Sequence, residues 1–404
     1  MMTLTAVHPT EPAALELQAE AEARGFLAAW APAELPAAWK KSYQRWIAEG
    51  RNAGLGQLAR ALEVRLDPQM RFSWVRSVLL LIAPYAYPDP GIPESGVRIG
   101  RVAQKFWVRE PDPFFLKRLL EPHIEGLKEL AHRLGMRVRD YVDQGPLPLN
   151  LYAVRSGLFW RGYNAMPNSL DFGTRITLAC LLTEIPVTTP VLHPDRCGSC
   201  RRCVVCCPTG ALLGDRRVDL NRCISYWTTS YQGLIPPAFQ PAIGDWLLGC
   251  DICQEVCPWN EKAARAGWYW QGFKPDPDLA HPDLSDFFIL SDQDFARKYH
   301  HSAFERIGRI RIARNALIVL ANTGDSAYLP LVSRATTDIA PLVRATAAWS
   351  LVRLGGRKQA YRLLRDPDET VRREAANALA GAESPVTLWQ AKAAGKVLRA
   401  EITE

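Results

Sequence analysis

The residues best suited to chemistry in this sequence are cysteines between positions 197 and 257, eight of which have iron–sulfur spacing. The first run follows the pattern C-x₂-C-x₂-C-x₃-C-P, which is typical of ferredoxins that hold 4Fe–4S clusters. In two-cluster ferredoxins, the fourth cysteine of such a run ligates the other cluster, and a second run supplies the remaining thiolates. This crosswise rule predicts two complete 4Fe–4S sites. They are Cys197, Cys200, Cys203 and Cys257 for the first, and Cys207, Cys223, Cys250 and Cys253 for the second.

Other uses of these thiols fit the pattern less well. Disulfides suit secreted chains, whereas a long intracellular chain keeps its thiols for metals or catalysis. Structural zinc usually takes two C-x₂-C pairs set further apart. Cys206 is a spare cysteine, because the x₃ spacing and the following Pro208 favour Cys207 as the ligand. Cys180 lies in an apolar run and is predicted to be a small, buried hydrophobic residue.

Length and composition set broad limits on the class of protein. A chain of 404 residues predicts two or three domains, and 48% hydrophobic residues are ample for their cores. No apolar run approaches the length of a membrane span, and the N-terminus lacks a basic region followed by an apolar core. We therefore expect a cytoplasmic protein with no membrane association. The net charge of +7 suits a polyanionic partner without requiring one.

The elements that must position the cysteines begin with an α/β layer. Residues 13–64 are predicted to be helical, and residues 77–85 form a buried apolar strand that ends in a proline-rich loop. Period-3.6 spacing predicts a helix over 113–134 with Gly135 as its C-terminal cap. A second strand is expected over 136–142, and further helix through 157 and over 174–184. Strands joined by a helix favour a ligand site at the strand ends.

The C-terminal part of the sequence repeats itself. The pattern A-x-x-[AS]-L occurs at residues 313–317, 347–351 and 375–379, which is typical of stacked helix pairs of the HEAT type. A basic run precedes and overlaps the first repeat. A charge run is usually a solvated face, but on a solenoid it also suits phosphate binding. The candidates for contacts with nucleic acid are Arg306, Arg309, Arg311 and Arg314.

Three motifs together resemble the epoxyqueuosine reductase family. They are Cys-Ile-Ser-Tyr at 223–226, Gly-Cys-Asp-Ile-Cys-Gln-Glu-Val-Cys-Pro-Trp-Asn at 249–260, and Val-Asp-Gln-Gly at 142–145. The resemblance implies an α+β multidomain protein with an α/β cobalamin-binding domain, a ferredoxin-like domain for two 4Fe–4S clusters, and C-terminal HEAT-like repeats. We place these domains at 1–185, 186–262 and 263–404, the last including a linker.

The resemblance also implies a function and a set of site residues. Members of that family reduce the epoxide of epoxyqueuosine at the wobble position of tRNA, in the last step of queuosine synthesis, with cobalamin in its base-off form beside one cluster. The aspartate of the Val-Asp-x-Gly turn, here Asp143, is the proton donor. An external low-potential electron donor and a monomeric state are expected. Residues matching positions that face or hold the cobalamin are Arg65, Asp143, Asn164, Ser225 and Asp251.

This sequence departs from the family pattern at several positions. The family's Gly-Lys-Asn is Gly162-Tyr163-Asn164 here, and its Lys-Gly is Gln232-Gly233. The family's aromatic Arg-Asp-Tyr-His segment is replaced here by residues 105–112, Lys-Phe-Trp-Val-Arg-Glu-Pro-Asp. A paralogous cobalamin and iron–sulfur reductase, similar to a reductive dehalogenase, is the alternative within enzymes. A plain electron-transfer ferredoxin on a scaffold is the other alternative, although about 180 residues before the clusters exceed what electron transfer requires.

Overall fold

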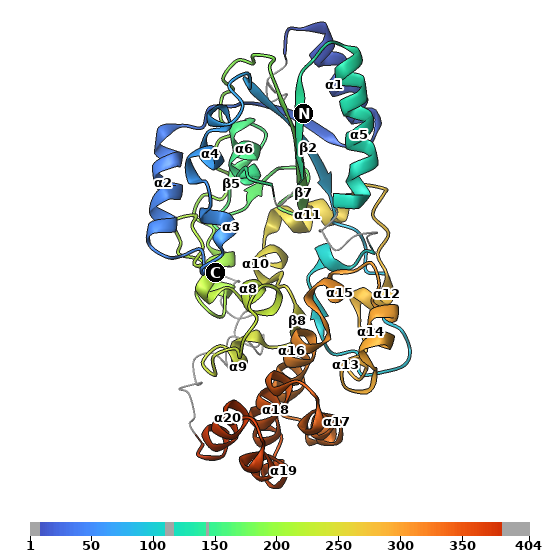
Figure 1. The fold of residues 1–404 in the computed structure, drawn as a ribbon. Helices are drawn as coiled ribbons and strands as arrows, with labels where there is room; N and C mark the ends of the chain where they lie inside the picture. Colours follow the sequence, from blue (N-terminus) through green and yellow to red (C-terminus); the bar gives the residue numbers. More distant parts are fainter. Residues whose placement is uncertain (1–8, 110–116, 143–144, 382–404) are drawn as a thin grey trace.

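The computed structural model describes residues 9–109, 117–142 and 145–381 (Figure 1). A sheet-containing part lies at one end of the molecule, a cysteine-rich part lies in the middle, and a stack of helices lies at the other end. This arrangement confirms the predicted α+β multidomain class. Within the described residues, no helix is both long enough and apolar enough to cross a membrane.

A four-stranded sheet forms the centre of the first part. Its strand order is β1-β2-β7-β4, and every neighbouring pair is antiparallel. The central pair is in register from Ser77 opposite Thr183 to Pro84 opposite Ile176. Consequently β2 and β4 run in the same direction on either side of β7. The strands are β1 (Leu27–Pro32), β2 (Ser77–Pro84), β4 (Val138–Val142) and β7 (Ile176–Thr183).

Helices cover both faces of this sheet. Alternate side chains of β2 point to opposite faces, so Leu79 and Leu81 pack with α1 and α5 while Val78 and Leu80 pack with α6. Figure 1 shows α1 and α5 on one side of the sheet and α2, α4 and α6 on the other. The helices of this part are α1 (Pro12–Ala23), α2 (Ala37–Ala48), α3 (Gly56–Ala59), α4 (Leu62–Leu66), α5 (Lys117–Arg133) and α6 (Leu149–Arg155).

The sequence predictions are wrong for two of these strands. Residues 27–32, predicted within a helical segment, form the edge strand β1, and the predicted helix over 174–184 contains the strand β7. Every residue of β7 is buried, because helices cover both faces of the sheet. A strand buried on both faces lacks the polar–apolar alternation that normally identifies it, and Ala and Leu then read equally well as helix.

The helix before β4 ends as its sequence predicts. Gly135 has a φ of +73°, a left-handed conformation that glycine adopts without a steric penalty. The Gly135 N–H donates to the carbonyl of His132, and the Met136 N–H donates to that of Ala131. This is the Schellman arrangement, which satisfies the last carbonyls of α5 and turns the chain into β4.

The middle part consists of short helices and loops, and a segment of the first part crosses into it. β3 (Arg101–Val102) pairs in parallel with β8 (Trp246–Leu248). Buried residues of this segment therefore share one core with the middle part and the helical stack. The other elements are β5 (Trp160–Arg161), β6 (Pro167–Asn168), α7 (Arg202–Cys206), α8 (Ile224–Thr229), α9 (Gln240–Ile243), α10 (Ile252–Glu255) and α11 (Pro258–Ala266).

The helical stack has a repeated ion-pair arrangement that explains the repeated arginines of its sequence. Arg309 at the start of α16 pairs with Asp338 at 2.7 Å, and Arg344 of α18 pairs with Asp366 at 2.7 Å. The helices are α12 (Pro277–Ala280), α13 (Asp286–Ile289), α14 (Asp292–Lys298), α15 (Ala303–Ile307), α16 (Arg309–Asn322), α17 (Leu329–Arg334), α18 (Pro341–Arg353), α19 (Arg357–Arg362) and α20 (Glu369–Leu379). Short 3-10 helices lie at Pro68–Met70, Gln104–Phe106, Leu220–Arg222, Ser326–Tyr328, Ala335–Thr337 and Leu363–Arg365.

Arg314 attaches the first repeat to the middle part, and its predicted contact with nucleic acid is wrong. Its side chain has an exposed fraction of 0%, and its guanidinium donates to the carbonyls of Trp227, Tyr231 and Gly233 at 2.7–2.9 Å. Burial lowers the pKa of Arg314 to about 9, which still leaves the group protonated at neutral pH. The neighbouring Asn315 donates to two further carbonyls of the middle part. A guanidinium enclosed in this way cannot reach a phosphate.

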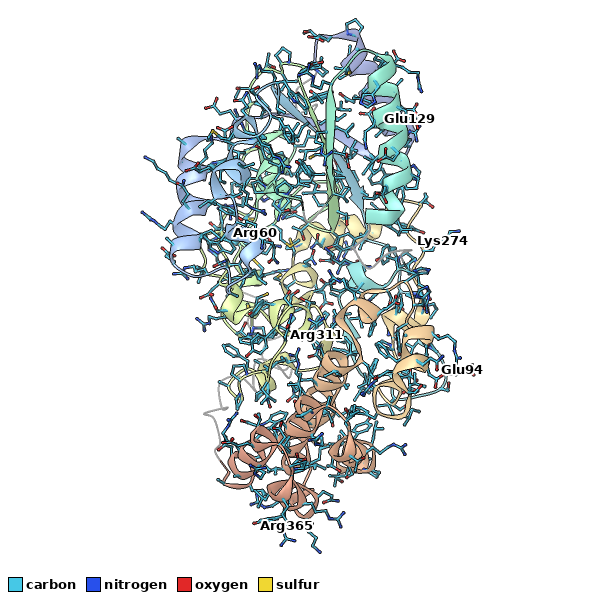
Figure 2. All side chains as sticks on the ribbon, in the orientation of Figure 1. Arg60, Glu94, Glu129, Lys274, Arg311 and Arg365 are labelled. Atoms are coloured by element: carbon cyan, nitrogen blue, oxygen red, sulfur yellow. The ribbon has the colours of Figure 1, made fainter. Side chains whose placement is uncertain are left out.

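The change Arg314→Leu should therefore destabilise the protein without acting on a nucleic-acid surface. Three buried carbonyls would lose their donor, and we expect a loss of about 2–5 kcal/mol in the free energy of unfolding. Denaturant unfolding followed by tryptophan fluorescence measures this. The exposed Arg365, at the far end of the stack (Figure 2), supplies the control. Arg365→Leu should change stability by about 0.5 kcal/mol or less, and equal stability of the two variants would contradict the attachment role.

Candidate active site and cluster sites

The fold brings together the four cysteines predicted for the first cluster. All four line one small cavity of about 180 Å³. Burial is the main cause that raises the pKa of Cys203 to about 12, and repulsion from the other three thiols adds to it. Thiols arranged in this way need a positively charged group to become thiolates together, which a metal cluster supplies. The set is Cys197, Cys200, Cys203 and Cys257.

The second group of cysteines lies on a larger cavity. Cys223, Cys250 and Cys253 line a space of about 610 Å³ between the sheet, the middle part and the helical stack. Burial raises the pKa of Cys253 well above its usual value, and repulsion from Cys223, Cys207 and other acidic groups adds to the shift. Cys207 lies near this group, because repulsion from it also raises the pKa of Cys223, and its place in the second cluster stays a prediction. Its Sγ accepts the Ala211 N–H at 3.3 Å.

The two remaining cysteines behave differently from one another. Cys180 is fully buried in β7, which confirms its predicted place in the hydrophobic core. Burial strongly raises the pKa of its thiol. Cys206 is partly buried at the end of α7, directly before Cys207.

Asn164 lies between the two groups of cysteines. It occupies the loop of the β5–β6 hairpin and lines both the small and the large cavity. Its Oδ1 accepts the Met166 N–H at 3.3 Å, and Ala165 has a φ of +64° in the same turn. A non-glycine residue in the left-handed region indicates a turn whose shape is imposed by its surroundings. The hairpin therefore holds the Asn164 amide at the wall that separates the cavities.

Asp251 lines the large cavity and also holds its wall in place. Its carboxylate accepts the Gln104 N–H at 2.8 Å and the Gln254 amide at 2.7 Å. Gln254 in turn accepts the Thr174 hydroxyl, directly before β7. Asp251 is buried, with an exposed fraction of 4%. It links the cluster loop to the sheet and to the crossing segment, and its contact with cobalamin stays a prediction.

Ser225 and Arg65 lie on different cavities. Ser225 lines the large cavity, and its hydroxyl has no hydrogen-bond partner among the described residues. Arg65 instead lines an adjoining cavity of about 290 Å³, whose walls share Asn150 and Ile176 with the large one. Arg65 donates to the Tyr43 hydroxyl at 2.8 Å and to the Pro146 carbonyl at 3.2 Å. Arg65 therefore fixes the chain shortly after position 143.

Asp143, the predicted proton donor, lies outside the described residues. β4 ends at Val142, so the structure defines the strand that leads to it. On the other side, Pro146 is held by Arg65.

Two of the four predicted nucleic-acid contacts line the large cavity. Arg306 and Arg311 form its wall on the side of the helical stack, and Figure 2 shows Arg311 near the middle of the molecule. Arg309 is held by Asp292 and Asp338, and Arg314 is buried. Residues of the cavity that sequence reasoning did not assign include Gln57, Tyr85, Lys105, Phe106 and Asn150. Lys105 begins the segment in which the sequence departs from the family pattern. This departure was the one sequence feature that could have pointed to these residues.

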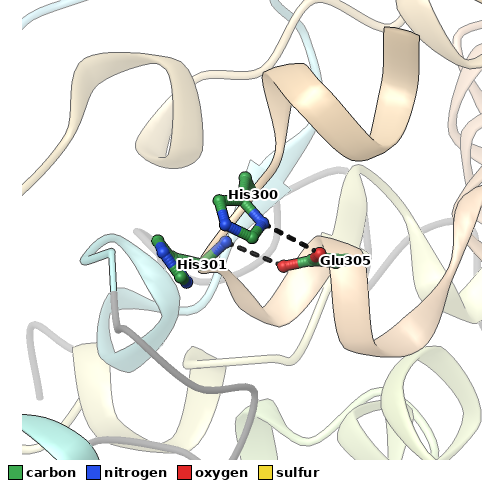
Figure 3. Close-up of side chains that lie close together, drawn as sticks. All are labelled: His300, His301 and Glu305. Atoms are coloured by element: carbon green, nitrogen blue, oxygen red, sulfur yellow. Dashed lines mark hydrogen bonds and ion pairs between the residues drawn. The ribbon is translucent and has the colours of Figure 1, made fainter. Parts of the chain in front are cut away.

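A further cluster of polar side chains lies at the start of α15 (Figure 3). His300, His301 and Glu305 offer ligand atoms within 4.8 Å of one another. Both carboxylate oxygens of Glu305 already have partners, the His301 N–H at 2.8 Å and the His300 ring at 3.0 Å. The carboxylate thus satisfies donors at the beginning of a helix, which explains the cluster without a metal.

The cysteine geometry and the helical stack define an iron–sulfur oxidoreductase with a repeat domain. Residues 196–260 match the family of 4Fe-4S double cluster binding domains, and residues 308–380 match HEAT repeats. Epoxyqueuosine reductase of Bacillus subtilis is 31% identical over 299 residues, which is 73% of this chain and 75% of that protein. The corresponding protein of Lactococcus garvieae is 32% identical over 295 residues, 72% of this chain and 82% of that one. The chain belongs to the epoxyqueuosine reductase family.

Solved structures agree with this assignment. An epoxyqueuosine reductase with a tRNA-Tyr epoxyqueuosine-modified tRNA stem loop superposes with a TM-score of 0.81 at 26% identity, over 91% of this chain and 97% of that one. The enzyme from Bacillus subtilis with its catalytic aspartate loop swung out of the active site gives a TM-score of 0.80 at 26% identity, over 91% and 98%. These relatives support the reductase prediction and not the dehalogenase-like alternative.

The two neighbouring cysteines allow a sharp test of the cluster ligands. We expect Cys207→Ser to lower the iron content of anaerobically prepared protein from about eight atoms per chain, the sum of two cubanes. Cys206→Ser should leave it unchanged. Iron analysis together with the visible absorption of the clusters measures both. The opposite result would exchange the roles of the two residues, and a plateau near half the iron in the unaltered protein would contradict the crosswise assignment.

Proposed function

We propose that this protein reduces the epoxide of epoxyqueuosine in tRNA to the alkene of queuosine, using cobalamin and two 4Fe–4S clusters. The observation that carries the proposal is the large cavity. It brings Asn164, Ser225 and Asp251, three of the four described residues expected to contact cobalamin, onto one surface with three cysteines of the second group, while Arg65 lines the adjoining cavity. The comparisons with named reductases support the same reaction. The cytoplasm, where tRNA is modified, is the proposed location, and a monomer is the proposed state.

The residues of the large cavity fit a corrin ring with amide side chains. The volume of about 610 Å³ is in the range of small-molecule sites, and the walls combine apolar side chains with hydroxyl and amide groups. The Ser225 hydroxyl is available for a ligand. No histidine lines the cavity among the described residues, so no imidazole is present to ligate cobalt, in agreement with a base-off cofactor. Trp39, Tyr43 and Trp46 line the adjoining cavity and suit a detached aromatic base.

The reaction sets requirements for the residues around the substrate. Reducing an epoxide to an alkene consumes two electrons and two protons and releases the oxygen as water. Bound cobalamin supplies a metal centre that accepts single electrons and acts as nucleophile or radical partner. An alkoxide is a poor leaving group, so a carboxylic acid must deliver a proton to the departing oxygen. We propose Asp143 for this role, directly after β4 and before the segment that Arg65 holds at Pro146.

The protein's own side chains divide the remaining work. We propose that Cys197, Cys200, Cys203 and Cys257 ligate the cluster remote from the large cavity, and that Cys207, Cys223, Cys250 and Cys253 ligate the cluster beside it. Arg306 and Arg311 line the same cavity, and their positive charges suit the phosphates of a tRNA loop that reaches into it. Arg311 keeps its charge while it donates to the carbonyls of Ile307, Thr229 and Arg306. Arg309 is proposed to act only indirectly, because Asp292 and Asp338 hold its guanidinium.

The change Asp143→Asn tests the mechanism. It preserves shape and a hydrogen-bond donor but removes the transferable proton, so turnover of epoxyqueuosine tRNA should fall by about 10²–10⁴-fold. Iron content, cobalamin absorption and tRNA affinity should stay unchanged. In cells that lack the protein, tRNA nucleosides should contain epoxyqueuosine in place of queuosine, and the Asn variant should fail to restore queuosine. If this variant turned over at a near-normal rate, the proton donor would be water or another side chain and not Asp143.

The double change Arg306→Ala and Arg311→Ala tests the tRNA surface. Loss of phosphate contacts should weaken tRNA binding and reduce the salt dependence of log K by about one per contact. Fluorescence anisotropy with a labelled anticodon stem loop at several salt concentrations measures both. The double change Arg133→Ala and Arg137→Ala, at the far end of the sheet part, removes the same charge as a control. An unaltered salt slope in the first variant would make these arginines merely structural.

A further inference from the structure

Four arginines surround the exposed loop of the first cysteine group. We call Arg196, Arg201, Arg202 and Arg216 the arginine rim. Arg196 and Arg202 line the small cavity together with the cysteines, and Arg201 donates to the carbonyls of Gly198 and Cys200. Cys200 itself is exposed. One carboxylate, Asp195, pairs with Arg216 at 2.6 Å, so a positive excess remains around the cluster loop.

Tyr163 fixes two members of the rim. The guanidinium of Arg201 lies 3.4 Å from the centre of its ring, and that of Arg216 lies 4.3 Å from it. Such cation–π contacts hold long side chains in one orientation. Tyr163 occupies the position of the lysine in the family's Gly-Lys-Asn segment. Tyrosine in place of this lysine removes one positive charge from the hairpin. Positive charge is nevertheless present at the same place, on Arg201 and Arg216, which lie over the Tyr163 ring.

The other two members of the rim are available to a partner. The side chains of Arg196 and Arg202 are exposed and make no hydrogen bond or ion pair with any residue that the structure describes. Val205, on the same helix as Cys203, is half exposed, with an exposed fraction of 51%. Arginine combined with exposed apolar side chains is typical of surfaces that bind proteins.

The position of the rim relative to the cavities indicates what it binds. The second cysteine group lines the large cavity, whereas the first group lies behind Asn164 and reaches the surface at Cys200. Electrons that arrive from outside therefore meet the first group first. We infer that the arginine rim is the docking surface for a small acidic protein that carries one electron at a time. This inference rests on the proposed function, because the reduction of one epoxide needs two electrons and hence two such encounters.

Nucleic acid is the less suitable partner for this surface. The cations proposed for tRNA lie on the wall of the large cavity, where the substrate must enter, and the rim surrounds the other cysteine group. Electron carriers form small, transient complexes that depend on charge for rapid association. Salt should therefore weaken carrier binding strongly, since the rim charges are exposed.

The double change Arg196→Glu and Arg202→Glu tests the inference with an acidic flavodoxin as the probe. At low salt, the affinity of the cluster-loaded protein for oxidised flavodoxin should fall by about ten- to a hundredfold, together with the rate of cluster reduction by the reduced carrier. Photoreduced deazaflavin, a small neutral and strongly reducing donor that needs no docking surface, should still reduce the clusters of this variant completely. The control is Lys358→Glu with Arg365→Glu, two exposed residues of the helical stack that change the net charge equally. This control should bind flavodoxin like the unaltered protein.

Other outcomes would overturn the inference. If the rim variant bound flavodoxin with unchanged affinity, the rim would not be the docking surface. If that variant instead bound the labelled stem loop more weakly, the rim would be a nucleic-acid surface. Loss of deazaflavin reduction or of iron would mean that the variant damages the cluster site, and Arg196→Gln with Arg202→Gln then repeats the measurement. Failure of the proposed function is distinguishable, because flavodoxin binding and cluster reduction are measured without tRNA.

Discussion

A buried polar network at the junction of the sheet part and the middle part is the constraint on which the site depends. Asn260 accepts the Thr174 N–H at 2.6 Å and donates to the Gln254 carbonyl at 2.8 Å. Gln254 then bonds Asp251, which holds the crossing segment at Gln104. Each of these groups is buried, and leaving one without a partner would cost about 1–3 kcal/mol. The start of β7, the cluster loop and the crossing segment are thereby fixed relative to one another.

This network explains why the second cysteine motif is more specific than cluster ligation requires. Three of its non-cysteine residues, Asp251, Gln254 and Asn260, are members of the network. Gly173 belongs to the same constraint. Its φ is +58°, and a Cβ there would lie 1.9 Å from the Asn260 side-chain oxygen. The non-cysteine residues by which this motif resembles the family are thus residues that attach the cluster loop to the sheet.

The sequence predicted some features well because their causes are local. Cysteine spacing, the glycine cap at Gly135 and the helical repeats each depend on residues close in the chain, and the structure agrees with all three. The strand β7 and the role of Arg314 depend on what packs around them. An arginine in a basic run reads as a surface residue until the carbonyls that surround it are known. Charge alone therefore could not separate the fully buried Arg314 from Arg311, which also donates to backbone carbonyls but lines the large cavity.

The corrected sheet topology also accounts for the place of the cavities. The two adjoining cavities lie where β2 ends and β7 begins, although the strands are antiparallel. β2 ends at Pro84 opposite Ile176, the first residue of β7, while β4 ends earlier, with Val142 opposite Ala179. The first residues of β7 consequently have no β4 partner. Ile176 lines both adjoining cavities instead, and Leu178 lines the smaller one. The early end of β4 therefore leaves the first residues of β7 open to the two cavities.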